Sequence, residues 1–190
     1  MQGNNAGTQG KGVFLVYFLT FICQIGTAIK SIRFNPQQPS LAAVATNTLI
    51  HLVDVSRGVV VHTVNGQHQK TVNACDWSRD GKLLVSCSAD DAIVVLDLSG
   101  SSPTVKASLA VNEKMFSCVF SPVSSSVVYF GSYQSIHAWN FATSSRHVQA
   151  AHDNLIPCLA TTVMPAAGGA RAAQLASVSH DASVKLWALH

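Results

Sequence analysis

Two series of residues recur along this chain with the same step, and this repetition constrains its fold more than any other feature. The first series occupies one matching position in four strand-like segments and consists of Val53, Leu96, Trp139 and Trp187. Its steps are 43, 43 and 48 residues. The second series also repeats every 43 residues, each member standing just before a turn, and consists of Phe34, Trp77 and Phe120. Two independent series at one period predict a chain built of repeated structural units.

The period identifies the kind of unit. Repeats of about 40–45 residues with four short strands each are typical of β-propeller blades. We place the units at 25–66, 67–109, 110–150 and 151–190. The last unit is five residues longer, and we assign the excess to the small-residue stretch 165–173, in the hairpin between its first two strands. Because no helical periodicity follows residue 25, the sequence predicts an all-β fold.

Composition supports buried strands and argues against some partners. Hydrophobic residues make up 48% of the chain and charged residues only 11%, which suits short strands buried on both faces. The net charge is +3, and no run of Lys or Arg forms a basic patch. We therefore expect neither direct nucleic-acid binding nor attachment to an anionic membrane. No residue pattern indicates a metal or cofactor site.

The cysteines indicate a reducing compartment. Their number, five, is odd, and none forms a Cys-x-x-Cys pair. A secreted chain of this size would be expected to hold an even number in a disulfide framework. Four of them lie in apolar strand-like runs and are expected to be small buried hydrophobes, namely Cys75, Cys87, Cys118 and Cys158. We expect a nuclear location, with a cytoplasmic one as the alternative.

The first 24 residues are unassigned and contain an apolar run at 13–23, with the sequence VFLVYFLTFIC. This run is shorter than the ~20 residues that a membrane-spanning helix needs. A buried strand is the favoured interpretation. A signal or anchoring segment, or a junction from an altered gene prediction, is an alternative.

Two units carry a His, a Ser and an Asp with matching spacing. In both, Asp lies four residues after Ser and six before the recurring apolar position. The two sets are His68, Ser86 and Asp90, and His152, Ser177 and Asp181 followed by Trp187. These residue types could form a hydrolytic triad. A set that recurs with the repeat is better explained as a buried hydrogen-bonded chain that stabilises each blade, as in the WD40 repeats that this pattern resembles. We therefore expect no enzymatic activity.

The other positions depart from this pattern. In the second unit Leu96 stands where Trp would complete the set, and the third has Tyr133 in the Asp place and Tyr129 in the Ser place. The first unit has Asn47, Ala43 and Val53, and relies on packing. Only the fourth unit can form the whole set.

Longer motifs resemble one WD40 family. The stretches FSCVF, GSYQS and SHDASVKLW resemble the last blades of the plant LEUNIG-type transcriptional co-repressors, over about residues 25–188. The resemblance implies a nuclear scaffold that links DNA-binding factors, through adaptor proteins, to repressive machinery including histone deacetylases and Mediator. Its partners would be such co-repressor components or transcription-factor adaptors. The dimerisation region and Gln-rich stretch that precede the propeller in that family have no counterpart here. A generic WD40 adaptor, such as a ubiquitin-ligase substrate receptor or a complex-assembly subunit, is the alternative.

Four units are few for a ring of this type, because the resemblance implies seven blades. The fourth unit ends at His190 after its third strand, and only 13–23 could supply the closing strand. We expect an open arc, an incomplete part of a seven-bladed ring. Its exposed end faces would then associate with a partner or with each other.

Partners of propellers commonly dock on the face that carries the loops before the first strand and between the second and third strands. The candidate binding residues on that face are Lys70, Asn73, Tyr133, Asn154 and His180. Tyr133 is the strongest candidate, because aromatic side chains are enriched at interface hot spots. The alternative for Tyr133 is packing against Trp139 or a neighbouring blade.

Overall fold

The computed structural model describes residues 25–165 and 171–189. The apolar run 13–23 lies outside these residues. Within them every regular element is a strand, so the predicted all-β fold is confirmed. In chain order the strands are β1 (Ser31–Phe34), β2 (Leu41–Ala45), β3 (Ile50–Asp54), β4 (Val59–Val64), β5 (Val72–Trp77), β6 (Leu83–Ser88), β7 (Ala92–Asp97), β8 (Thr104–Ala110), β9 (Ser117–Phe120), β10 (Val127–Gly131), β11 (Ser135–Asn140), β12 (Ser145–Ala150), β13 (Cys158–Pro165), β14 (Arg171–Val178) and β15 (Val184–Leu189).

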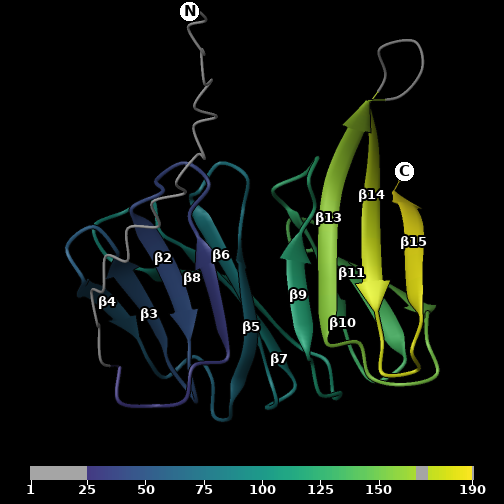
Figure 1. Ribbon diagram of the computed structural model, residues 1–190, viewed down its shortest axis with the longest axis horizontal. Coiled ribbons are helices and arrows are strands. Elements are labelled where there is room, and N and C mark those ends of the chain that lie inside the picture. Colours follow the sequence, from purple (N-terminus) through teal and green to yellow (C-terminus); the bar gives the residue numbers. More distant parts are fainter. Residues whose placement is uncertain (1–24, 166–170, 190) are drawn as a thin grey trace, which may run out of the picture.

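The strands form four antiparallel sheets, each made of consecutive strands. Blade 1 is β1–β4, blade 2 is β5–β8 and blade 3 is β9–β12, while the described part of blade 4 is the three-stranded β13–β15. The sheets stand side by side, with the inner strands β5, β9 and β13 next to one another in order (Figure 1). Among the described residues, no strand pairing joins blades 1 and 4 into a ring. The fold is therefore an open arc of propeller blades, as the repeat predicts.

The strands pair in the same way in each blade because the same residue types recur. Phe34, Trp77 and Phe120 are the last residues of β1, β5 and β9. An irregularity in strand pairing also recurs in two of the blades. The pairing of the third and fourth strands shifts between Leu52 and Val53 in blade 1 and between Val95 and Leu96 in blade 2. In blade 4 the long hairpin β13–β14 takes up residues at both ends of the predicted insertion (Figure 1).

Apolar side chains pack between neighbouring blades, so each interface is a small core of its own. One buried cluster joins blades 1 and 2 and includes Ile50, Leu52 and Trp77. A second joins blades 2 and 3 and contains Val95 and Phe130. The third, between blades 3 and 4, is smaller. Because each repeat contacts only its neighbours, stability depends on these nearest-neighbour interfaces.

The cysteines in the described part of the chain separate into two groups. Cys75, Cys87 and Cys118 are buried free thiols at the interfaces between blades, as expected. Burial raises the pKa of the Cys75 thiol to about 12, so it stays protonated and acts as a small apolar group. The expectation for Cys158 was wrong, since this residue is exposed. It lies on β13, the inner strand of blade 4, on the face that points away from blade 3. No described blade covers that face.

Candidate functional site

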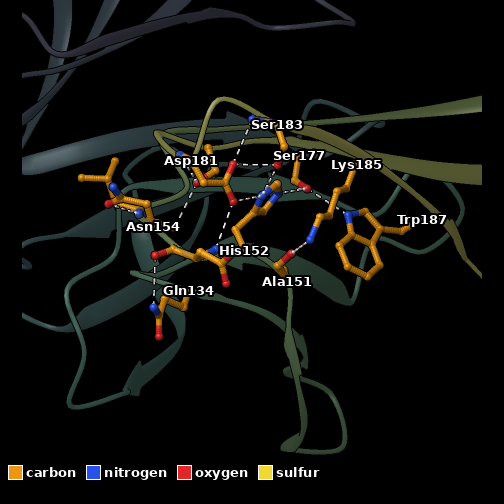
Figure 2. Close-up of polar contacts among 12 residues, drawn as sticks. Gln134, Ala151, His152, Asn154, Ser177, Asp181, Ser183, Lys185 and Trp187 are labelled. Atoms are coloured by element: carbon orange, nitrogen blue, oxygen red, sulfur yellow. Dashed lines mark hydrogen bonds and ion pairs between the residues drawn. The ribbon is translucent and has the colours of Figure 1, made fainter.

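Blade 4 contains a continuous chain of polar contacts (Figure 2). His152 comes from the loop before β13, Ser177 from β14, Asp181 from the turn between β14 and β15, and Trp187 from β15. The Nδ1 atom of His152 lies 2.9 Å from Oδ2 of Asp181, and Nε2 lies 2.8 Å from Oγ of Ser177. Trp187 Nε1 donates to the same Oγ at 2.9 Å. One histidine thus connects a loop, a turn and two strands.

The Asp181 carboxylate determines which ring nitrogen of His152 donates a hydrogen bond. The Ser183 hydroxyl, the backbone N–H of Asp153 and the His152 ring hold the pKa of Asp181 well below its usual range, against the opposing effect of burial. The carboxylate is therefore ionised and accepts the Nδ1 proton of His152. Nε2 is then free to accept the hydroxyl proton of Ser177. Every member of the set has a partner, which is the condition for a buried polar network to be stable.

Blade 2 repeats the arrangement without the tryptophan. His68 Nδ1 lies 3.3 Å from both carboxylate oxygens of Asp90, and Nε2 lies 2.8 Å from Ser86 Oγ. Burial lowers the pKa of His68, and Asp90 opposes that effect. Leu96 occupies the tryptophan position and is buried in the cluster between blades 1 and 2. The Ser86 hydroxyl is 3.5 Å from the carbonyl oxygen of Val94.

Two further serines support these sets and were missed by the sequence interpretation. Ser88 and Ser179 each precede the Asp of their blade by two residues. The Ser88 hydroxyl donates to the carbonyl of Lys70, and that of Ser179 donates to the carbonyl of Asn154. Both hydroxyls also accept the N–H of the nearby Asp, at 3.2 Å. The repeated Ser-x-Asp spacing was the signal that could have identified them.

Blade 3 holds a different polar contact. The assignment of Tyr129 to the serine place was off by one residue, because Phe130 pairs with Cys118 as Ser86 pairs with Cys75. Phe130 stacks on the His137 ring with centroids 4.8 Å apart. His137 is fully buried, and its Nε2 lies 3.2 Å from Ser132 Oγ and 3.6 Å from a Glu113 carboxylate oxygen. Burial lowers the pKa of this histidine.

The geometry of the His–Ser–Asp sets resembles that of a hydrolytic triad, but the serine hydroxyls are not accessible to a substrate. A nucleophilic serine must reach a substrate carbonyl carbon. The side chains of Ser86 and Ser177 have 0% exposure. In blade 4 the Ser177 oxygen is also occupied by the Trp187 N–H. These sets can hold a loop, a turn and strands together, but a substrate cannot approach the hydroxyl.

The candidate binding residues lie on the loop face, where the first and third strands of each blade begin; this edge is the lower one for β13–β15 in Figure 1. Three of the side chains are free for contact. Tyr133 is 57% exposed in the turn between β10 and β11, which argues against packing on Trp139. Lys70 and His180 are also exposed. The loops of blades 3 and 4 are joined by the Gln134 amide, which donates to the carbonyl of Asp153 at 3.1 Å.

The other two candidates are engaged in the fold. The side-chain amide of Asn73 donates to the carbonyl of Met115 at 2.6 Å, which links blade 2 to the loop that leads into blade 3. Asn154 is half-buried, and its side-chain oxygen accepts the N–H of Leu155 at 2.8 Å. Loop position alone could not distinguish these structural amides from free ones.

Within residues 25–165 and 171–189, no helix is long and apolar enough to span a bilayer. Across the same ranges, no group of three or more His, Cys, Asp or Glu side chains is placed to hold a metal ion.

The fold and the repeated His–Ser–Asp sets together form an open arc of β-propeller blades that resembles part of a WD40 propeller. The sequence model of the family described as "WD domain, G-beta repeat" matches residues 58–97. The chain is similar to the "Transcriptional corepressor LEUNIG_HOMOLOG" of Arabidopsis thaliana, with 30% identity over 160 residues, which is 84% of this chain and 19% of that protein.

Shorter similarities extend to other proteins. The human "WD repeat and SOCS box-containing protein 1" is 32% identical over 110 residues, covering 57% of this chain and 26% of that protein. The "Putative guanine nucleotide-exchange factor SED4" of Saccharomyces cerevisiae is 28% identical over 99 residues, or 52% of this chain and 9% of that protein. The chain therefore spans 26% or less of the length of each of these relatives.

Proposed function

We propose that this chain is an interaction scaffold of a nuclear transcriptional co-repressor of the LEUNIG type, and that it holds its partner proteins on the loop face without catalysing a reaction. The observation that supports the co-repressor assignment most is the extent of the similarity. It covers 84% of the chain for the relative named a transcriptional co-repressor, against 57% for the SOCS box-containing relative.

The loop face supplies the surface for such a role. Tyr133 presents an aromatic ring at a turn where the other networks have an aspartate. The turn that carries Tyr133 is held in place by the adjacent Ser132. The Ser132 hydroxyl hydrogen-bonds to the carbonyl of Ser135 and lies within hydrogen-bond distance of His137 Nε2. An exposed aromatic on a rigid turn loses little conformational freedom on binding, which is the usual property of an interface anchor.

The proposal is tested by co-purification from Arabidopsis thaliana cells that express the tagged chain, followed by identification of the captured proteins. We expect subunits of the repressive machinery, such as histone deacetylase or Mediator components. Tyr133→Ala is expected to reduce their capture by about tenfold, as for a hot-spot aromatic. Val123→Ala is the matched control, since Val123 is 62% exposed but lies in a turn between the first two strands of its blade, away from the loop face.

The second candidate is a substrate receptor of a ubiquitin ligase, which the similarity to the SOCS box-containing relative favours. The same experiment distinguishes the two. Recovery of ubiquitin-ligase subunits in place of repressive machinery would replace the co-repressor assignment with this one. Equal capture by the Tyr133→Ala protein and the unsubstituted chain would show that Tyr133 takes no part in binding.

A further inference from the structure

A groove opens on the edge of the blades that lies opposite the loop face. This turn face is where the first and third strands of each blade end, and it is the upper edge for β13–β15 in Figure 1. The groove has a volume of about 410 Å³, which lies within the range of small binding sites. It is lined by the turns between the first two strands of blades 1, 2 and 3. No loop-face residue contributes to it, so the groove is a separate surface.

Contacts between the turns of blades 1 and 2 hold one wall of the groove in place. The side-chain oxygen of Asn35 accepts the backbone N–H of Gln37 at 2.9 Å, and its amide donates to the carbonyl of Gly81 at 2.9 Å. The Gln37 amide donates to the carbonyl of Arg79, also at 2.9 Å. Gly81 has a φ of 69°, and a Cβ at this position would clash with the Asn35 side chain. The backbone that carries Arg79 is therefore fixed by the neighbouring blade.

Arg79 is the positive charge that this groove offers to a ligand. Its side chain is exposed, and within residues 25–165 and 171–189 no hydrogen bond or ion pair engages its guanidinium group. Arg33 and Arg57 differ, because their guanidinium nitrogens lie 3.9 Å and 3.8 Å from a carboxylate oxygen. A guanidinium group that is free at its tip can form two parallel hydrogen bonds with a carboxylate.

Asp80 also lines the groove and limits the charge that a ligand can carry. Its carboxylate accepts the Ser78 hydroxyl at 2.6 Å and the backbone N–H of Lys82 at 3.2 Å. These hydrogen bonds hold the pKa of Asp80 below its ordinary value, against the effect of burial, so the group is ionised at neutral pH. Among the described residues that line the groove, Arg79 is the one cation. A single carboxylate suits this balance better than a phosphate group, which carries more than one negative charge.

The turn of blade 3 gives the groove an apolar wall. Val123 is 62% exposed, and it lies beside Pro122 in the turn between β9 and β10. Ser125 adds an exposed hydroxyl in the same turn. Burial of apolar surface contributes to binding in proportion to its area. A small anion would contact Arg79 alone, whereas a peptide can contact both the cation and the apolar wall.

We propose that this groove binds an acidic peptide segment of a second partner protein, with an Asp or Glu side chain on Arg79 and a neighbouring apolar side chain against Val123 and Pro122. The proposal goes beyond the loop face and does not depend on the co-repressor role. Because the two surfaces lie on opposite edges of the blades, the scaffold holds this segment while a loop-face partner is bound. Val123→Ala therefore alters the groove and leaves loop-face binding unchanged.

The test begins with selection from a phage-displayed library of random decapeptides on the full chain. We expect the enriched peptides to carry Asp or Glu next to an apolar residue. Fluorescence anisotropy then measures the Kd of each selected peptide. Arg79→Glu should raise the Kd by more than about tenfold, because repulsion replaces a charge-assisted pair. Arg146→Glu makes the same change of charge on the exposed outer strand β12 and should leave the Kd within about twofold.

An exchange of charges gives the decisive result. A selected peptide in which Lys replaces the acidic residue should bind the Arg79→Glu protein more tightly than it binds the unsubstituted chain. Arg79 is exposed, so its substitution leaves the fold intact, which thermal unfolding checks. The proposal would be overturned by a library that yields no enriched peptide, or by enriched peptides without an acidic residue. Equal binding of the selected peptides to the Arg79→Glu protein and the unsubstituted chain would overturn it as well, as would a Lys peptide that shows no preference for Arg79→Glu.

Discussion

The Nε2 atom of His152 lies 2.8 Å from the hydroxyl oxygen of Ser177, a side chain with no exposed surface. This hydroxyl also accepts the indole N–H of Trp187. At a solvent-exposed site, a His–Ser contact of this kind would indicate a nucleophilic serine. Here the same contact is buried and joins a loop to two strands of blade 4. The consequence is a stabilising role that can be measured.

Ser177→Ala should lower the free energy of unfolding by about 1–3 kcal/mol, because it leaves the Trp187 N–H and the His152 ring nitrogen without their buried partner. Urea unfolding followed by far-UV circular dichroism measures the change. Ser145→Ala, at an exposed serine, controls for the loss of a hydroxyl and should change stability by less than about 0.5 kcal/mol. Equal stability of Ser177→Ala and the unsubstituted chain would contradict the role assigned to this set.

Completing the set in blade 2 should not stabilise the protein. Leu96 stands in the tryptophan position but is 1% exposed within a packed cluster. Leu96→Trp adds volume that this interface has no room for, so we expect a loss of about 1–3 kcal/mol in the free energy of unfolding. The same urea titration decides the matter. A gain in stability would mean that the hydrogen bond to Ser86 outweighs the packing strain.

Asn73 should affect stability and leave partner binding unchanged. Its amide donates to the carbonyl of Met115, so Asn73→Ala removes a contact between blade 2 and the loop leading into blade 3. We expect a loss of about 1 kcal/mol in the free energy of unfolding. Lys70→Ala, at an exposed loop residue nearby, serves as the control and should leave stability within about 0.5 kcal/mol. Reduced partner capture by Asn73→Ala at unchanged stability would support the original sequence interpretation instead.

The stability of the protein should fall as the pH is lowered below about 6.5, the ordinary pKa of histidine. Burial lowers the pKa of His137, Arg146 acts in the same direction, and Glu113 opposes them. The unfolded chain then binds the proton more tightly than the folded one. The stabilisation is complete above the unfolded pKa and is lost as the pH falls through the folded pKa.

His137→Phe tests this pH dependence, since it removes the titrating ring and retains an aromatic against Phe130. Unfolding free energies measured from pH 7 to pH 5 should decline less steeply in this variant than in the unsubstituted chain. His147→Phe, which replaces an exposed imidazole, is the matched control. An identical decline in all three proteins would show that His137 does not contribute.

The parts of the structure that follow the repeat could be predicted from sequence. The 43-residue step places Phe34, Trp77 and Phe120 at equivalent strand ends, so the positions in one blade predict those in the next. Blade 3 could not be predicted in the same way. Its first hairpin is one residue longer than that of blade 2, which moves Phe130 into the serine place and brings it against His137. A shift of one residue moves every side chain of a strand to the opposite face of the sheet, and amino-acid composition cannot reveal such a shift.

Other departures depend on neighbours in space. Cys158 lies in an apolar run like the buried cysteines, yet it is exposed because no described blade covers its side of blade 4. Asn73 and Tyr133 both lie toward the loop face, but only the structure shows that one amide is engaged and the other side chain is free. Burial and hydrogen bonding at such positions are set by the adjacent blade, which a local sequence pattern does not contain.

We propose that the loop face acts in transcriptional repression, and tethering the chain to a gene tests this role. The chain is fused to an unrelated DNA-binding domain, and the expression of a reporter gene carrying its binding site is measured in Arabidopsis thaliana cells. We predict that the fusion lowers reporter expression, that Tyr133→Ala abolishes the effect, and that Val123→Ala retains it. Reporter expression equal to that with the DNA-binding domain alone would show that the chain does not repress transcription, and equal repression by both variants would show that Tyr133 is not needed for it.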